Sequence, residues 1–212
     1  PKKFSQYVNL EEGSLKIKAG TTISEIVLFN PLEKFMRDYP KICVDVVSGR
    51  SSTAIEMVSN GELDMAIVPL PSEEIKENID IIKYKSLELV VYSTKEYLEK
   101  NNIDINKWED ILKGTLILPT TTSNTGKVIY SFFQTQNLNI NSKYIFSSNT
   151  SRKRIAKDGL GIGIGLKDAI KKENFVISNL KLPKIDIGII IQKKEIASFA
   201  TLKLLEYIMD NK

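Results

Sequence analysis

Residue types that commonly build catalytic and metal sites are scarce or absent in this chain. The 212 residues include no histidine and a single cysteine, Cys43. An internal disulfide is therefore excluded, as are zinc sites built on several His or Cys ligands. Without an imidazole base, a nucleophilic role for Cys43 is disfavoured, and its place in a β-branched run predicts the buried thiol of a core strand. This cysteine usage favours a reducing compartment, so we expect a cytoplasmic protein.

Long apolar runs and blocks of one charge are also missing. The most continuous apolar stretches, 160–166 and 187–191, are far shorter than the roughly 20 residues that cross a bilayer. The amino terminus has basic residues but no apolar segment or small-residue cleavage site, so it does not resemble a secretory signal. The net charge of +4 comes from lysines interspersed with almost as many acids. This pattern argues against a membrane partner and against direct DNA binding by these residues.

Periodic segments of two kinds alternate along the chain. Because the strands are joined by helices rather than by hairpins, they favour an α/β fold with parallel sheets covered on both faces. The β-α-β pattern occurs twice, which indicates two lobes of about 100 residues each. Strands are predicted at 15–19, 42–47, 63–68, 87–92, 115–118, 144–147, 162–164 and 185–191, and helices at 23–39, 53–59, 95–99, 106–112, 126–134, 150–157 and 196–209.

The first helix has an internal proline. Apolar residues follow helical spacing over 23–39, with Thr22 or Ser24 as the expected cap. Pro31 lacks an N–H, and its ring crowds the preceding turn. We therefore expect a kink at Pro31 or a helix start near Asn30.

Four strands run into clusters of small polar residues, and each cluster opens a helix. The carboxyl edge of a parallel sheet is where these clusters should lie, and helix N–H groups and dipoles favour an anion there. Each hydroxyl also has a simpler possible role as an N-cap. One cluster alone is not diagnostic, but the recurrence favours a ligand site. The clusters are 20–24, 48–52, 120–125 and 147–151.

Arginines near these clusters have two interpretations. Arg50 is placed to hold a carboxylate bidentately, and an exposed surface arginine is equally compatible with its position. Arg152, Lys153 and Arg154 form a short basic cluster on a helix with apolar residues on its other side. A solvated helix face is the first expectation for these three, and contact with a ligand or a second subunit is the alternative.

The glycine-rich segment 159–165 is not a dinucleotide loop. It lacks the GxGxxG spacing, and it follows a predicted helix instead of preceding one. We interpret it as a helix stop followed by a tightly packed strand. Trp108, on an amphipathic helix, is expected to seal the core of the second lobe.

Several segments form one ordered pattern. They are 13–20, the Tyr39-Pro40 helix end, Ser48-Gly49, 60–67 with its Gly-Glu-Leu-Asp, 108–114 and 157–164. In this order they resemble the regulatory domain of LysR-type transcriptional regulators, from about Gly13 to the last residue. One departure is Gly165-Leu166, where the family often has Leu-Pro or Val-Pro.

The resemblance implies a two-lobed type 2 periplasmic-binding-protein-like fold, each lobe a mostly parallel sheet flanked by helices. Lobe I is expected at 13–86 with 185–212 and lobe II at 87–184, while 1–12 would be a remnant of a linker. The resemblance also implies an effector in the cleft between the lobes. It places effector contacts at Thr21, Thr22, Arg50, Ser51, Ser52, Thr121, Thr122, Ser123, Asn149, Thr150, Ile164 and Gly165.

The expected function is sensing of a small polar, anionic effector, with no catalytic residues, cofactor or metal. The resemblance implies a homodimer, a tetramer in the full-length form, and promoter DNA bound only through an N-terminal helix-turn-helix that these residues lack. One alternative is an extracytoplasmic solute-binding protein, which would need a signal or a lipoprotein cysteine. Another is a small-molecule enzyme, but its acid–base work would fall to Asp or Glu, and the four clusters contain neither.

Overall fold

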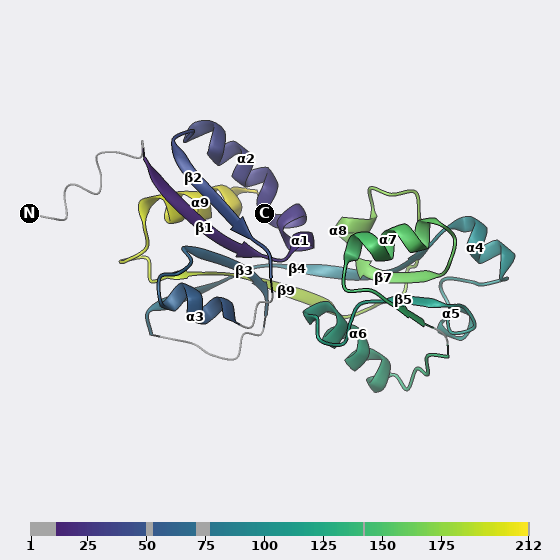
Figure 1. Cartoon of the computed structure of the whole chain (residues 1–212). Helices are drawn as coiled ribbons and strands as arrows, with labels where there is room; N and C mark the ends of the chain where they lie inside the picture. Colours follow the sequence, from purple (N-terminus) through teal and green to yellow (C-terminus); the bar gives the residue numbers. More distant parts are fainter. Residues whose placement is uncertain (1–11, 50–52, 71–76, 142, 212) are drawn as a thin grey trace, which may run out of the picture. The chain divides into compact units, whose positions relative to one another are not determined.

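The fold consists of two units, each a sheet with helices on both faces (Figure 1). The computed structural model describes residues 12–49, 53–70, 77–141 and 143–211. Unit 1 comprises the chain up to Lys85 and from Asp186 onward, and unit 2 comprises Ser86–Ile185. The chain passes between the units within two strands, β4 (Ile79–Ser93) and β9 (Lys184–Gln192). The predicted α/β fold class is confirmed.

Unit 1 is built on three parallel strands. β1 (Gly13–Ala19) pairs with β2 (Ile42–Val47) on one side and with β3 (Met65–Pro69) on the other. β9 then joins β3 in antiparallel pairing and lies next to β4. Leu15 and Ile17 of the central strand are fully buried, as expected where helices cover both faces of a sheet. The antiparallel β9 makes the sheet mixed instead of wholly parallel.

The first helix of unit 1 contains a π turn just before its proline. The helix runs through α1 (Thr21–Ile23), the π turn η2 (Ser24–Leu28) and α2 (Phe29–Asp38). Pro31 cannot donate a backbone hydrogen bond, and its ring crowds the carbonyl four residues earlier. That carbonyl belongs to the wider π turn, which accommodates the proline without ending the helix. The predicted irregularity near Asn30 is thus a π turn.

Two further helices complete unit 1. Figure 1 shows α2 and α9 (Phe199–Asp210) on one face of the sheet and α3 (Ala54–Ser59) on the other. Aromatic rings join α2 to α9, since the ring centroids of Phe35 and Tyr207 lie 5.8 Å apart in an edge-on arrangement. Burial of these faces is where most of the helical stability arises.

Unit 2 repeats the plan with a second mixed sheet. Its strands follow the order β4-β7-β5-β6, in which β5 is parallel to both neighbours, while β7 and the short β8 pair with β4 in antiparallel fashion. Figure 1 shows α7 and α8 on one face and α6 on the other. The bounds are β5 (Leu116–Leu118), β6 (Lys143–Ile145), β7 (Ile162–Leu166), β8 (Val176–Ile177), α4 (Lys95–Lys100), α5 (Trp108–Ile111), α6 (Asn124–Thr135), α7 (Asn149–Lys157) and α8 (Lys167–Ile170).

The ring of Trp108 packs against α6. Its centroid lies 5.7 Å from that of Phe132 and 5.8 Å from that of Phe133. Phe133 is buried, so the indole covers the apolar side of α6. The expectation that Trp108 seals the core of this lobe is confirmed.

The ring of Tyr92 fills the space left by two glycines of β7. A Cβ on Gly163 would lie 2.2 Å from Cζ of Tyr92, and a Cβ on Gly165 would lie 3.5 Å from its Cε1. Tyr92 is fully buried, and burial raises its pKa to about 12. Gly159 ends α7 with a φ of +71°, a conformation that glycine adopts at little cost. The interpretation of this segment as a helix stop and a tightly packed strand is confirmed.

Cys43 corrects a prediction. The β-branched run in β2 indicated a core strand and hence a buried thiol, but Cys43 is exposed. β2 lies at the edge of the unit 1 sheet, and Cys43 alternates to the opposite face from the buried Ile42. A run of β-branched residues predicts a strand, but it does not reveal which positions other elements cover.

Gly163→Ala is expected to lower the free energy of unfolding by about 1–3 kcal/mol, because the added methyl overlaps a buried ring. Gly165→Ala is the matched control, since its methyl would make only ordinary contacts, at 3.5 Å or more. Its stability should stay level or rise slightly, because replacing a glycine restricts the unfolded chain. Urea denaturation of both variants makes the comparison. Equal losses would contradict the seating of Tyr92 on Gly163.

Candidate functional site

Parallel pairing gathers the polar clusters of each unit at one edge of its sheet. In unit 1 the β1–β2 register ends at the pair Lys18 and Val47, so the turns that follow both strands start side by side. In unit 2 the β5–β6 register ends at Leu118 and Ile145, with the same consequence. Carboxyl edges of this kind are where open α/β sheets bind ligands. The candidate residues 50–52 lie outside the described residues, and the other candidates can be placed.

The hydroxyls at the first helix of unit 1 are not used as caps. The N-cap is Gly20, which has no side chain, so the expected cap at Thr22 or Ser24 is wrong. Thr21 is exposed and Thr22 half-buried, which leaves both hydroxyls directed to other partners. Ser24 is buried, and its Oγ has no hydrogen-bond partner among the described residues. A buried hydroxyl without a partner costs stability, so this helix start is one place for a ligand contact.

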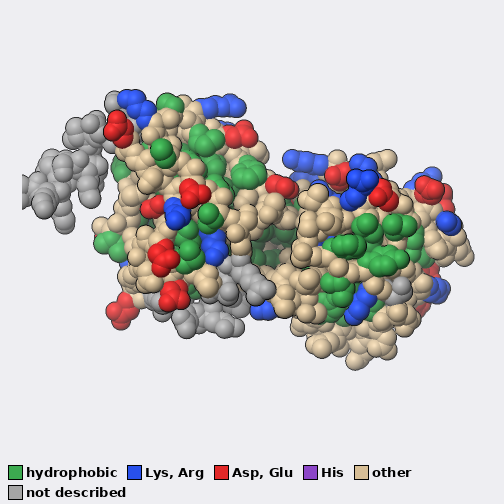
Figure 2. Space-filling view, viewed as in Figure 1, with side chains coloured by type: hydrophobic (Ala, Val, Ile, Leu, Met, Phe, Trp, Pro, Cys, Tyr) green, Lys and Arg blue, Asp and Glu red, His purple; other side chains and the backbone are tan. Residues whose placement is uncertain are grey.

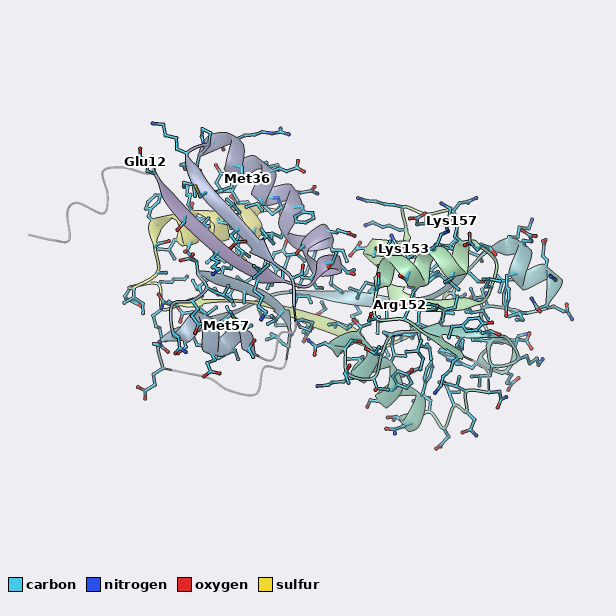
Figure 3. All side chains as sticks on the ribbon, in the orientation of Figure 1. Glu12, Met36, Met57, Arg152, Lys153 and Lys157 are labelled. Atoms are coloured by element: carbon cyan, nitrogen blue, oxygen red, sulfur yellow. The ribbon has the colours of Figure 1, made fainter. Side chains whose placement is uncertain are left out.

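Lys18 is a buried cation that sequence reasoning missed. Its side chain is 9% exposed, and its Nζ donates to Oγ1 of Thr53 at 3.0 Å and lies 3.6 Å from Sδ of Met57 on α3 (Figure 3). No ion pair within the described part of the chain includes it. The alternation of β1 suggested that Lys16 and Lys18 point to solvent, but a sheet covered on both faces buries the second of them.

At the start of α6, one hydroxyl of the 120–125 cluster serves the helix itself. Oγ of Ser123 accepts from the backbone N–H of Gly126 at 3.0 Å and donates to the carbonyl of Thr120 at 2.9 Å. Thr121 and Thr122 are exposed, and the hydroxyls of Thr122 and Thr120 lie 3.3 Å apart. The N-cap interpretation therefore explains Ser123, and Thr121 and Thr122 are the members of this cluster that can meet a ligand.

The start of α7 is arranged in the same way. Oγ of Ser148 accepts from the backbone N–H of Ser151 at 3.2 Å and caps the helix. Asn149 is half-buried and Thr150 is exposed. The cap is again a serine, and the next two residues remain open to other contacts.

The two candidates on β7 face opposite sides of the sheet. A Cβ on Gly165 would lie 3.8 Å from Oδ1 of Asn149, so the structure brings Gly165 to the start of α7. Ile164 is fully buried, and strand alternation turns its side chain to the other face. Gly165 and Asn149 thus belong to one place, and Ile164 does not share it.

Arg152 corrects the expectation of a solvated basic face. It is 5% exposed, and its Nη1 donates to the carbonyls of Phe146 at 2.8 Å and Ser147 at 3.2 Å. Its Nη2 lies 3.4 Å from Oδ1 of Asn149, and its Nε has no partner among the described residues. Helical side chains point back toward the amino terminus, and this carries the guanidinium under the first turn of α7.

The other basic residues of α7 behave as expected of a solvated face. Figure 3 shows Arg152 on the strand side of α7 and Lys157 on the opposite side. Lys153 and Lys157 each lie 3.5 Å from a carboxylate oxygen of Glu173, and Arg154 lies 3.0 Å from Asp158. Blue and red side chains accordingly mix on this part of the surface (Figure 2).

The charge of Arg152 lacks a counterion. Burial lowers the pKa of Arg152, but an arginine keeps its proton at neutral pH. None of the ion pairs among the described residues includes its guanidinium. The positive end of the α7 dipole lies at the same point, so this corner of unit 2 is strongly electropositive.

Clusters of metal ligands are not part of these corners. The residues that the structure describes include no group of three or more His, Cys, Asp and Glu side chains able to hold a metal ion. Over the same residues, no helix combines the length and the apolar character needed to span a membrane.

Comparison with known families now decides the identity of the fold. The model of the LysR substrate binding domain matches residues 9–212. The chain belongs to this family. Comparison with curated protein sequences finds no match for this LysR domain.

Solved structures share the fold of this LysR domain. The CcmR regulatory domain of Synechocystis PCC6803 in complex with 2-PG is 21% identical at a TM-score of 0.75, covering 94% of this chain and 97% of that one. The QuiR effector-binding domain in complex with shikimate is 19% identical at a TM-score of 0.73, with 94% and 97% covered. Full-length CbnR complexed with its target DNA is 14% identical at a TM-score of 0.71, with 100% and 73% covered.

Ser123→Ala is expected to lower the free energy of unfolding by about 1 kcal/mol, because the cap of α6 is lost. Thr121→Ala is its neighbour control and should change stability by less than about 0.5 kcal/mol, since its side chain is exposed. Urea denaturation of the two variants measures both values. If Thr121→Ala proved the more destabilising, the assignment of the cap to Ser123 would be wrong.

Proposed function

We propose that this LysR substrate-binding domain is the effector-sensing part of a transcriptional regulator. It binds a small polar, anionic metabolite and does no chemistry on it. The observation that carries the proposal is the family match over residues 9–212. The ligands in the titles of similar domains, 2-PG and shikimate, support a small polar effector, and shikimate is a carboxylate.

The effector contacts in unit 2 are proposed at the helix starts that follow β5 and β6. Thr121 and Thr122 at α6 have exposed hydroxyls, and Asn149 and Thr150 at α7 lie next to Gly165. Backbone N–H groups and the helix dipoles favour an anion at both places.

The effector contacts in unit 1 are proposed at the start of the first helix. Thr21 and Thr22 do not cap this helix, which leaves their hydroxyls for a ligand. A role for Arg50, Ser51 and Ser52 remains a prediction from the resemblance, as does the binding of one effector by both units.

The regulatory output depends on parts of the protein beyond this domain. Full-length CbnR was solved with its target DNA, and this chain covers 73% of that protein. By analogy, promoter contacts come from an N-terminal helix-turn-helix, in dimers that pair into tetramers, and the protein works in the cytoplasm, where its promoter is. An effector shifts such an assembly only through different affinities for its states, and a tenfold difference corresponds to about 1.4 kcal/mol.

A thermal-shift screen of small carboxylates, amino-acid derivatives and inorganic anions tests the proposal. A ligand present at 100 times its Kd should raise the free energy of unfolding by about 2.7 kcal/mol, which appears as a higher melting temperature. A domain that is stabilised only by neutral compounds, or that processes a compound during the assay, would contradict it.

The double variant Thr121→Val/Thr122→Val tests the α6 half of the site. Valine keeps the shape of threonine and removes the hydroxyl, so the folded domain should persist while the affinity for the stabilising ligand falls at least tenfold. Thr135→Val is the matched control, because Oγ1 of Thr135 donates to the carbonyl of Ser131 at the far end of the same helix. A double variant with an undiminished melting shift would show that these hydroxyls do not bind the ligand.

A further inference from the structure

The uncompensated charge of Arg152 is the feature of unit 2 that packing does not explain. Burying an ionised group without a counterion is costly, and replacing it with an apolar residue of similar size is often neutral or stabilising. Arg152 is nonetheless 5% exposed, with no carboxylate within ion-pair distance among the described residues. A charge retained at such a cost points to a partner that the chain does not supply.

The guanidinium presents one used edge and one free edge. Nη1 is held by the carbonyls of Phe146 and Ser147. The opposite edge consists of Nε, which has no partner, and Nη2, whose contact with Asn149 is 3.4 Å long. That distance is well beyond the usual 2.9 Å of an N–H···O bond. Nε and Nη2 together form the fork with which arginine holds an oxyanion through two parallel hydrogen bonds.

The surroundings of this free edge also favour an anion. The guanidinium lies at the amino-terminal turn of α7, a helix of 9 residues, whose dipole is positive there. Tyr92, which packs in the core cluster beneath α7 with Ala156, has a buried hydroxyl without a partner among the described residues. Gly165 leaves room beside Asn149. Two unsatisfied polar side chains thus meet at one helix start.

We propose that Arg152 is the charge-reading residue of unit 2 and binds an oxyanion group of the effector, a carboxylate or a phosphate, through its Nε–Nη2 edge. This inference rests on the proposed function and assigns the α7 half of its site. Nη1 fixes the orientation of the guanidinium, and Asn149 holds Nη2 until the ligand oxygen takes its place. A neutral analogue would leave the buried charge unpaired, so Arg152 makes the site selective for anions.

The test compares wild type with Arg152→Met, which keeps the length of the side chain and removes the charge. The probes are inorganic phosphate, shikimate, and the neutral methyl ester of shikimate, each followed by thermal shift at constant ionic strength. Anion affinity should fall at least tenfold in Arg152→Met, and binding of the ester should not change. Without ligand, the variant should melt at or above the wild-type temperature, because a charge without a counterion is no longer buried.

Arg154→Met is the matched control. It removes an equal charge from the same helix, but Arg154 is exposed and paired with Asp158, so the anion response should persist. A lower melting temperature for Arg152→Met together with an undiminished anion response would show a structural role and overturn the inference. The proposed function would survive that result, whereas it would fail if no small polar compound stabilised the wild type.

A second measurement decides the matter if Arg152→Met does not fold. The chain has four arginines, Arg37, Arg50, Arg152 and Arg154, so their Nε–H signals can be resolved by NMR in the wild-type protein. The Arg152 signal should shift saturably with phosphate or shikimate, and the better of the two identifies the oxyanion class. A signal that moves no more than that of Arg37 would overturn the inference.

Discussion

Parallel pairing between neighbouring strands is the constraint on which both candidate corners depend. It directs the carboxyl ends of β1 and β2 to one edge in unit 1, and those of β5 and β6 to one edge in unit 2. The turns that follow these strands start at adjacent positions because the registers end level. Antiparallel pairing would send alternate turns to opposite edges. The polar residues of each unit therefore meet because of topology, before any side chain contributes.

Packing in unit 2 then sets where α7 can lie. The ring of Tyr92 rests on the glycine side of β7, and Ala156 of α7 packs in the same core cluster. This fixes the depth of the helix over the sheet, and Arg152, one turn before Ala156, is carried beneath it. Core packing and the polar corner are thus one construction, in which small residues on a strand allow a charged side chain to be buried.

Much of this arrangement could be predicted from the sequence, because periodicity shows where strands and helices lie. Periodicity does not show which face a neighbour covers. Cys43 and Arg152 exchanged their expected environments for that reason: the thiol lies on an edge strand, and the guanidinium folds back under its own helix. The first half of β4 was missed because Lys83 and Lys85 interrupt its apolar pattern, and α8 and β8 are too short to produce a periodic signal.

The polar clusters show the same limit at the level of single atoms. Composition predicted hydroxyls at the helix starts, but only hydrogen-bond geometry separates Ser123, which caps α6, from Thr121, which does not. Lys18 had no signal beyond its alternation in β1. Its burial depends on α3, which is distant in sequence.

The π turn at Ser24–Leu28 has a consequence for how this domain can change over evolution. A π turn holds one residue more than the α-helical turn it replaces, and each helical residue rotates the chain by about 100°. Deleting any one of these five residues would therefore swing Leu32 and Phe35 out of the core and bring the polar side of α2 against the sheet. Homologous helices should gain or lose that residue only when the apolar stripe downstream shifts with it.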